Sequence, residues 1–194
     1  YNKLKTAKKE ITSQMEITKE EIDYLENIML SIENCENLAE LMDIREELGK
    51  VGYLRSKNNS KKETKLTTKP HEFVSSNGFK ILVGNNKQND HLTLKVASNE
   101  DIWMHTKNIP GSHVIIKTEG KEVPDETIFE GAMLAAFFSK SKMSSQVPVD
   151  YTKKKNVKKP NGAKPGMVIY DTNNTIYVTP TEELVVKLKS KFDN

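Results

Sequence analysis

Residues 101–117 constrain the fold more than any other stretch of this 194-residue chain. They contain the only tryptophan, Trp103, and two of the four histidines. Pro110 and Gly111 follow one another between two apolar arms. Proline presets the first central dihedral of a turn, and glycine accepts the positive φ that a type II turn needs at the next position. The stretch therefore predicts a strand, a tight turn and a second strand.

The first arm predicts a sheet with two unlike faces, because successive side chains of a strand point to opposite sides. One face would be apolar and contribute to the core, and it carries Ile102, Met104 and Thr106. The other would present an acid, an indole, an imidazole and an amine, from Asp101, Trp103, His105 and Lys107. The alternative for the tryptophan is that it anchors the core, as a single tryptophan in a small domain commonly does.

The first segment of the chain is predicted to be a long helix. Apolar residues recur at alternating spacings of three and four from Leu4 to Ile32, which is the narrow stripe of a coiled-coil seam. Asn37 and Glu40 form a capping box for a second helix that we expect to end near residues 53–55. The two helices either close on each other as a hairpin, or the long one has lost an antiparallel partner. We favour the second option, in which case the exposed seam tends to form a dimer.

The chain then divides into three predicted parts. Residues 1–56 form the coiled-coil helix and the second helix, residues 57–69 a polar linker, and residues 70–194 a compact domain. Within the domain, Asn77-Gly78 predicts a hairpin, residues 92–97 a strand and residues 124–138 a buried helix. Further short strands are expected around residues 147–151, 157, 167–170 and 175–178, followed by a C-terminal helix. The predicted fold class is α+β, with an antiparallel or mixed sheet packed by a buried helix and preceded by a helical coiled-coil stalk.

The positive charge of the chain is concentrated in one segment. The chain carries a formal net charge of +3, yet residues 140–164 hold eight lysines and one acidic residue. Lysines bind phosphates as mobile point charges, and the glycines and asparagines between them allow close backbone approach. The alternative is a solvated loop, as lysine runs often are. We predict phosphate binding, because acidic residues are nearly absent and Tyr151 adjoins the run. The lysines are Lys153, Lys154, Lys155, Lys158, Lys159 and Lys164.

The sequence shows no complete pattern of a catalytic site or a metal site. Asp101, His105 and His113 do not match a compact metal-ligand spacing, and Ser112 lacks the glycines of a nucleophile elbow. Phosphate-cradling glycine loops are absent. We therefore expect a protein that is not an enzyme and holds no metal or cofactor.

The broad properties of the chain suggest a cytoplasmic location. The sequence contains no apolar run of the roughly 18 residues that cross a bilayer. A single cysteine, Cys35, fits a reducing compartment. Because the chain does not begin with methionine, we expect it to be part of a longer protein.

Several motifs are similar to a known family. The sequence Asp-Ile-Trp-Met-His at 101–105, followed by Ile-Pro-Gly-Ser-His-Val at 109–114, resembles the signature of the NFACT-R domain. That domain occurs in the family of RqcH, NEMF and the fibronectin-binding-protein-A-like proteins. The likeness extends to residues 84–90, 149–151 and 157–166, and residues 1–5 and 46–54 look like the closing arm of the family's central coiled coil. It covers essentially the whole chain.

The resemblance implies a ribosome quality-control factor. Such proteins bind an obstructed large ribosomal subunit and recruit tRNA, and in bacterial relatives the stalled chain receives an alanine tail. This chain would supply the coiled-coil arm and an RNA-binding domain, without the amino-terminal domain of the family. Some members are also called fibronectin-binding proteins, so fibronectin is an alternative partner acting through the coiled coil. Besides the six lysines, the predicted RNA-binding residues are Trp103, His105, Lys107, His113, Asn86 and Asn89.

Overall fold

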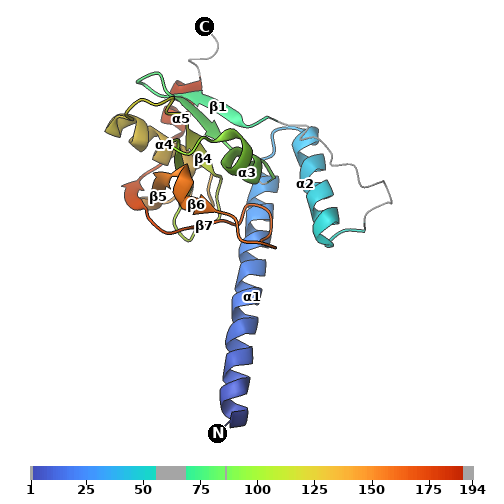
Figure 1. Cartoon of the computed structure of the whole chain (residues 1–194). Helices are drawn as coiled ribbons and strands as arrows, with labels where there is room; N and C mark the ends of the chain where they lie inside the picture. The colour runs from blue at the N-terminus through green and yellow to red at the C-terminus, as the bar shows by residue number, and fades with distance from the viewer. Residues whose placement is uncertain (1, 56–68, 86, 190–194) are drawn as a thin grey trace.

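The computed structural model describes residues 2–55, 69–85 and 87–189. A helical arm of α1 (Asn2–Glu33) and α2 (Leu38–Val51) precedes an α+β domain. Figure 1 shows the N-terminal half of α1 projecting well beyond the domain. The predicted 57–69 linker lies outside the described residues except for Lys69, and the boundaries of the three parts remain predictions.

The predicted N-cap of the second helix, Asn37, is confirmed, and the Glu40 carboxylate bonds one residue before the position that a capping box uses. The Asn37 side chain accepts a hydrogen bond from the backbone N–H of Glu40 at 3.0 Å, and a Glu40 carboxylate oxygen accepts the N–H of Glu36 at 2.9 Å. The helix ends at Val51, slightly earlier than expected, because Gly52 adopts a left-handed conformation with φ of 98°. Its N–H donates to the carbonyl of Leu48, which closes the last turn.

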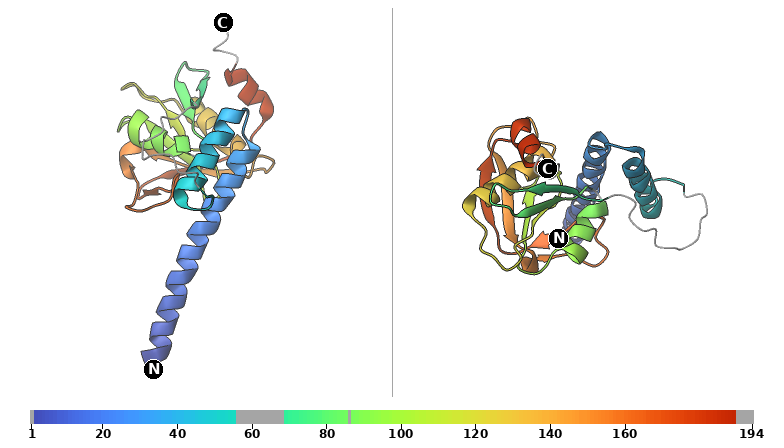
Figure 2. Two further views of the ribbon diagram at one scale, coloured as in Figure 1. Left: turned by 90° about the vertical axis from the view of Figure 1, so that its right-hand side faces the viewer. Right: turned by 90° about the horizontal axis from the view of Figure 1, so that it is seen from above.

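The face of α1 that packs is not the predicted seam. Tyr24 and Ile28 of α1 are buried against Ile44 of α2, and Figure 2 shows α2 alongside the C-terminal half of α1 only. Most seam residues remain exposed, including Leu4 at 78% and Met29 at 62%, but Leu25 is partly buried against the same cluster. The two helices do form a hairpin, and its contact covers the apolar seam only at Leu25.

The domain is built on a six-stranded sheet in the order β1-β2-β4-β3-β5-β8, in which every neighbouring pair is antiparallel. This resolves the predicted choice between an antiparallel and a mixed sheet. The Asn77-Gly78 turn joins β1 and β2 as predicted, with Gly78 at a φ of 83°. The strands are β1 (His71–Val74), β2 (Lys80–Val83), β3 (Ile102–Thr106), β4 (Val114–Ile116), β5 (Val147–Lys153) and β8 (Asn174–Val178).

The turn between β3 and β4 differs from the predicted one. Its positive φ lies at Asn108, at 54°, and not at Gly111. Gly111 is required for another reason, since a Cβ there would lie 2.6 Å from Thr106 Oγ1 and 3.1 Å from Ser139 Cβ. The glycine therefore permits a close approach between this turn and the end of α4.

Helix α4 (Asp125–Phe137) covers one face of the sheet, as predicted, and α5 (Glu182–Lys189) packs beside it. Met104 on β3 and Val114 on β4 are fully buried under α4, together with Leu134 of the helix itself. This position explains why α4 is apolar on nearly all sides, because most of its surface contacts the sheet or α5.

The opposite face of the sheet is also buried, which corrects the prediction of one polar face. Trp103 is fully covered there and packs with Leu82, Leu92, Ile115 and Val157. The covering layer consists of α3 (Lys87–His91), a π-helical turn η1 (Leu92–Val96) and the strand pair β6 (Val157–Lys158) and β7 (Ile169–Tyr170). We call this buried layer the tryptophan face. A 3-10 turn η2 (Lys154–Asn156), which has no buried residue, connects β5 to β6.

The predicted strand at residues 92–97 is wrong, because the segment is helical. Leu92 and Thr93 are both buried, and a strand would send consecutive side chains to opposite sides. The helical turn places the Leu92 side chain against the tryptophan face while Thr93 Oγ1 bonds to His113 Nδ1 at 2.8 Å. Tertiary contacts thus override the strand propensity of the segment.

Candidate nucleic-acid interface

The lysine segment lies at the end of β5, in η2, in β6 and in the loop before β7. Lys153 and Lys155 both bond to Glu100, at 2.6 and 3.0 Å. The hydrogen bonds from these two lysines hold the pKa of the Glu100 carboxyl below its usual value. All three side chains are about half exposed, so the pairs are loosely held and the lysines remain accessible to an anion.

Two of the predicted lysines hold the structure together. Lys159 Nζ bonds to the Asp90 carboxylate and donates to the Lys164 carbonyl at 3.0 Å. Lys164 Nζ donates to the Tyr53 hydroxyl at 3.1 Å and lies 5.1 Å from the centre of the Tyr24 ring. Lys164 therefore ties the loop before β7 to the helical arm. Replacing either lysine would disturb the fold as well as the charge.

The remaining predicted lysines are better placed for phosphate. Within the described part of the chain, the side chains of Lys154 and Lys158 make no ion pair, and Lys158 is exposed. Lys107 is about half exposed and its ammonium lies 3.8 Å from Asp150. Together with Lys153 and Lys155, which pair with Glu100 at the surface, they make five lysine side chains that a phosphate can reach.

The rings of the tryptophan face are packed against one another. Trp103 and His105 stack with centroids 5.9 Å apart, and the edge of His113 meets Trp103 at 5.2 Å. Trp103 and His113 are at most 1% exposed, whereas His105 is only partly buried. The prediction that Trp103 and His113 face outward is corrected, and His105 is the one of the three with accessible surface.

His113 is held as a neutral ring by its neighbours. Its Nε2 lies 3.1 Å from the Gly166 carbonyl, which only accepts hydrogen bonds, so Nε2 carries the proton. Nδ1 is then the acceptor for the Thr93 hydroxyl at 2.8 Å. Burial, followed by the nearby His105 ring, lowers the pKa of His113 well below its usual value. This arrangement fixes the tautomer and leaves no free ring nitrogen for a metal.

Of the two predicted asparagines, Asn89 is buried and Asn86 lies outside the described residues. Asn89 is 5% exposed, and its side-chain oxygen accepts the backbone N–H of His113 at 2.9 Å. It therefore organises the tryptophan face from within and does not present its amide to solvent. Asn86 lies outside the described residues, so its role stays a prediction.

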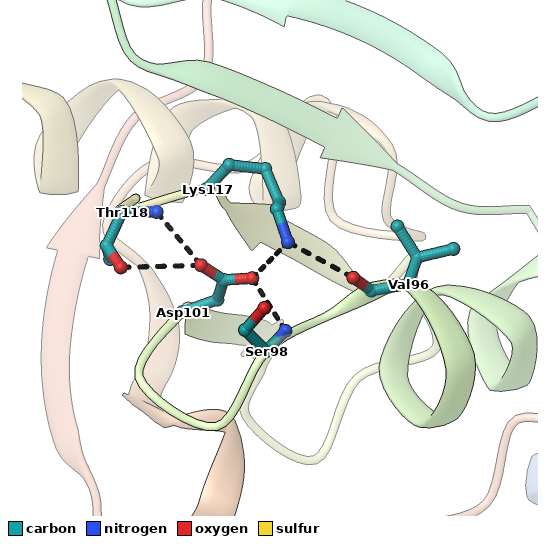
Figure 3. Close-up of polar contacts among 5 residues, drawn as sticks. All are labelled: Val96, Ser98, Asp101, Lys117 and Thr118. Carbon is teal, nitrogen blue, oxygen red and sulfur yellow. Dashed lines mark hydrogen bonds and ion pairs between the residues drawn. The ribbon is translucent and has the colours of Figure 1, made fainter. Parts of the chain in front are cut away.

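Asp101 anchors a buried polar cluster at the far end of β3. Figure 3 shows its carboxylate receiving hydrogen bonds from the backbone N–H groups of Ser98 and Thr118 and from the Lys117 ammonium. Lys117 also donates to the Val96 carbonyl at 3.1 Å. Burial alone would raise the pKa of Asp101, but these bonds outweigh it and the pKa lies below its usual value. Asp101 has a structural role.

A cleft of about 250 Å³ separates the tryptophan face from α1. His105, Trp103 and Tyr170 line its domain side, and Lys19, Asp23 and Asn27 line its helix side. The three helix residues are spaced by four, which places them on one face of α1. Asn27 Oδ1 accepts the Gly111 N–H at 3.0 Å and so fixes the arm to the β3–β4 turn.

Sequence reasoning missed this helix side of the cleft. Polar residues on the outer face of a long helix resemble any solvated surface, and only the docking of α1 on the domain brings them to Trp103. Tyr170 carried a weak signal, since it is an aromatic residue shortly after a lysine run.

The comparisons with known proteins agree with the architecture of an α+β domain carried on a helical arm. Residues 69–171 match the model of the NFACT protein RNA binding domain, and residues 1–67 match the NFACT N-terminal and middle domains. The chain therefore belongs to the NFACT RNA-binding-domain family, as its motifs suggested.

Its relatives include two proteins named Rqc2 homolog RqcH. That of Bacillus subtilis (strain 168) is 45% identical over 97% of this chain, and that of Streptococcus suis (strain 05ZYH33) is 43% identical over 97%. The chain spans about a third of the length of each, 33% and 34%. A solved structure, of the C-terminal part of the fibronectin/fibrinogen-binding protein from Streptococcus suis, superposes with a TM-score of 0.85 at 42% identity. That match covers 97% of this chain and 75% of the other.

Proposed function

We propose that this chain is the RNA-binding part of a ribosome quality-control factor. It binds the large ribosomal subunit and tRNA in the cytoplasm and supports alanine tailing of stalled chains, without being catalytic itself. The observation that carries this proposal is the match of its compact domain to the NFACT RNA binding domain, within a chain that is similar over 97% of its length to RqcH proteins.

The charge distribution supports this function. Five accessible lysines lie near the two ends of β3: Lys107 follows its last residue, and Lys153, Lys154, Lys155 and Lys158 belong to the segment that starts opposite its first. Neutralising about five phosphates gives a log-log salt slope near −3.5 for single strands and −4.5 for duplex. Affinity for tRNA should therefore fall steeply as salt rises.

The test is a titration of tRNA and of large subunits at several salt concentrations. Changing Lys154 and Lys158 together to glutamate should weaken binding and reduce the slope by about two, because each lost lysine removes about one counterion release. Lys121→Glu is the matched control, since Lys121 is an exposed lysine beside the β1–β2 turn. Equal affinity and slope for the double variant and the control would end the proposal.

The alternative function is a protein-interaction module or fibronectin-binding adhesin that acts through the arm. The exposed apolar seam of α1 favours it, as does the name of the Streptococcus suis structure. It predicts that removing residues 1–55 abolishes fibronectin or partner binding, while the lysine changes leave that binding intact.

Among the described residues, none of the helices combines the length and the apolar character that a membrane span requires.

A further inference from the structure

The cleft between α1 and the tryptophan face has the size of a small-ligand site. Its volume of about 250 Å³ falls just below the roughly 300–1,000 Å³ of pockets that hold drug-sized molecules. A single planar ring system suits it better than a folded peptide segment. One of the accessible lysines adjoins the cleft, since Lys107 immediately precedes Asn108 in its wall.

The domain wall of the cleft is a layered aromatic surface. His105 and Tyr170 are partly exposed, and Trp103 lies against both, 5.9 Å from His105 and 4.9 Å from Tyr170 between ring centres. The buried tryptophan holds the two outer rings in place, and the outer rings supply the contact. Aromatic rings of this kind stack on unpaired bases in proteins that bind single-stranded RNA.

The polar groups of the cleft match the edge of a base. On the opposite wall, the Asp23 carboxylate offers acceptors and Lys19 is exposed at the rim. Asn27 donates one amide hydrogen to the Asp23 carbonyl at 2.9 Å and keeps a second one for a ligand. The cleft thus combines an aromatic surface on one wall, polar groups on the other, and a cation at its rim.

We propose that this cleft receives one unstacked nucleobase of a bound RNA, with His105 and Tyr170 stacking on the base and Lys19 contacting its phosphate. The inference rests on the proposed RNA-binding function and adds a base-reading pocket to the phosphate-binding lysines. It also assigns a role to α1, because the pocket is complete only while the arm is docked on the domain through Asn27 and Lys164.

Trp103 provides the assay, because it is the only tryptophan and lines the cleft. Oligouridine is titrated against the full chain and compared with a base-free sugar-phosphate oligomer of equal length. We expect both to bind the lysines, but only oligouridine to change the Trp103 emission and to bind more tightly. If neither binds, the RNA-binding function fails; if both bind equally and the emission is unchanged, the function stands and the base pocket is refuted.

A variant separates the pocket from the lysines. His105→Ala should weaken oligouridine binding by about 5- to 150-fold, the loss typical of one stacked base, and leave the base-free oligomer unaffected. His91→Ala, at an exposed histidine outside the cleft, is the matched control and should bind both as the unaltered chain does.

A measurement on the unaltered chain avoids any effect of His105→Ala on folding. RNA containing 4-thiouridine is cross-linked by light, and the joined peptides are mapped by mass spectrometry. We expect cross-links within residues 103–110 and 166–170. Cross-links confined to residues 153–158 would refute the base pocket.

Discussion

Asp101→Asn gives the sharpest test of how the tryptophan face is stabilised. The Asp101 carboxylate uses one oxygen for the N–H of Thr118 and the other for Lys117 and the N–H of Ser98. An asparagine has only one oxygen, so whichever way the amide is turned its NH2 group meets donors at the other position. The change also leaves the Lys117 ammonium without its counter-charge, at 21% exposure.

The expected cost follows from that geometry. Removing one partner of a buried ion pair typically costs about 3–5 kcal/mol, because the other charge stays buried and unpaired. For a chain of this length each kcal/mol lowers the melting temperature by about 2–4 °C, so the loss should be about 6–20 °C. Urea and thermal unfolding followed by Trp103 fluorescence measure the stability of the domain and not of the arm.

The control is Glu72→Gln, which breaks the pair between Glu72 and Lys80. The charged atoms of that pair lie 2.7 Å apart, but the Glu72 side chain is 40% exposed and the Lys80 side chain 45%. Exposed pairs contribute about 0–1 kcal/mol, so this variant should be nearly neutral. If Asp101→Asn also costs less than about 1 kcal/mol, the cluster in Figure 3 does not stabilise the fold and the argument fails.

The same cluster predicts how stability depends on pH. The folded pKa of Asp101 is lowered, so its contribution is fully present above the unfolded pKa of about 3.9 and is lost as pH falls through the folded value. The stability difference between the unaltered chain and Asp101→Asn should shrink below about pH 4. A difference that stays constant down to the folded pKa would show that the carboxylate charge is not its source.

Three further changes test the arm and its joint with the domain. Tyr24→Phe removes the 2.8 Å hydrogen bond to Glu47 and should cost about 1.5–3 kcal/mol, seen as faster hydrogen exchange in α2; unchanged exchange would show that the bond is not needed. Gly111→Ala places a Cβ 2.6 Å from Thr106 Oγ1 and should destabilise the domain by about 1–3 kcal/mol in urea, an expectation that a neutral result would contradict. Ile11→Glu, in the exposed seam of α1, should abolish any dimer in sedimentation equilibrium if the seam mediates it, and an unchanged dimer would place the contact elsewhere.

The elements that were predicted correctly carry local chemical signals. The Asn37 cap, the Asn77-Gly78 turn and the apolar girth of α4 each depend on residues that are neighbours in sequence. The pattern of residues 92–97 misled, because alternation over six residues does not reveal that a second layer lies above the sheet. The turn residue was misplaced for a related reason, since Gly111 is needed for contact with the distant Ser139.

Periodicity, turn residues and charge runs are local properties, so they were enough to predict the α+β class, the basic segment and the helical arm, and the motifs pointed to the family by resemblance. Which of those residues a ligand can reach depends on the tertiary structure. It buried Trp103 and His113 beneath a second layer and used Lys159 and Lys164 as ties. It also formed a cleft by bringing Asn27 to a turn 84 residues away, a long-range contact that no local pattern encodes.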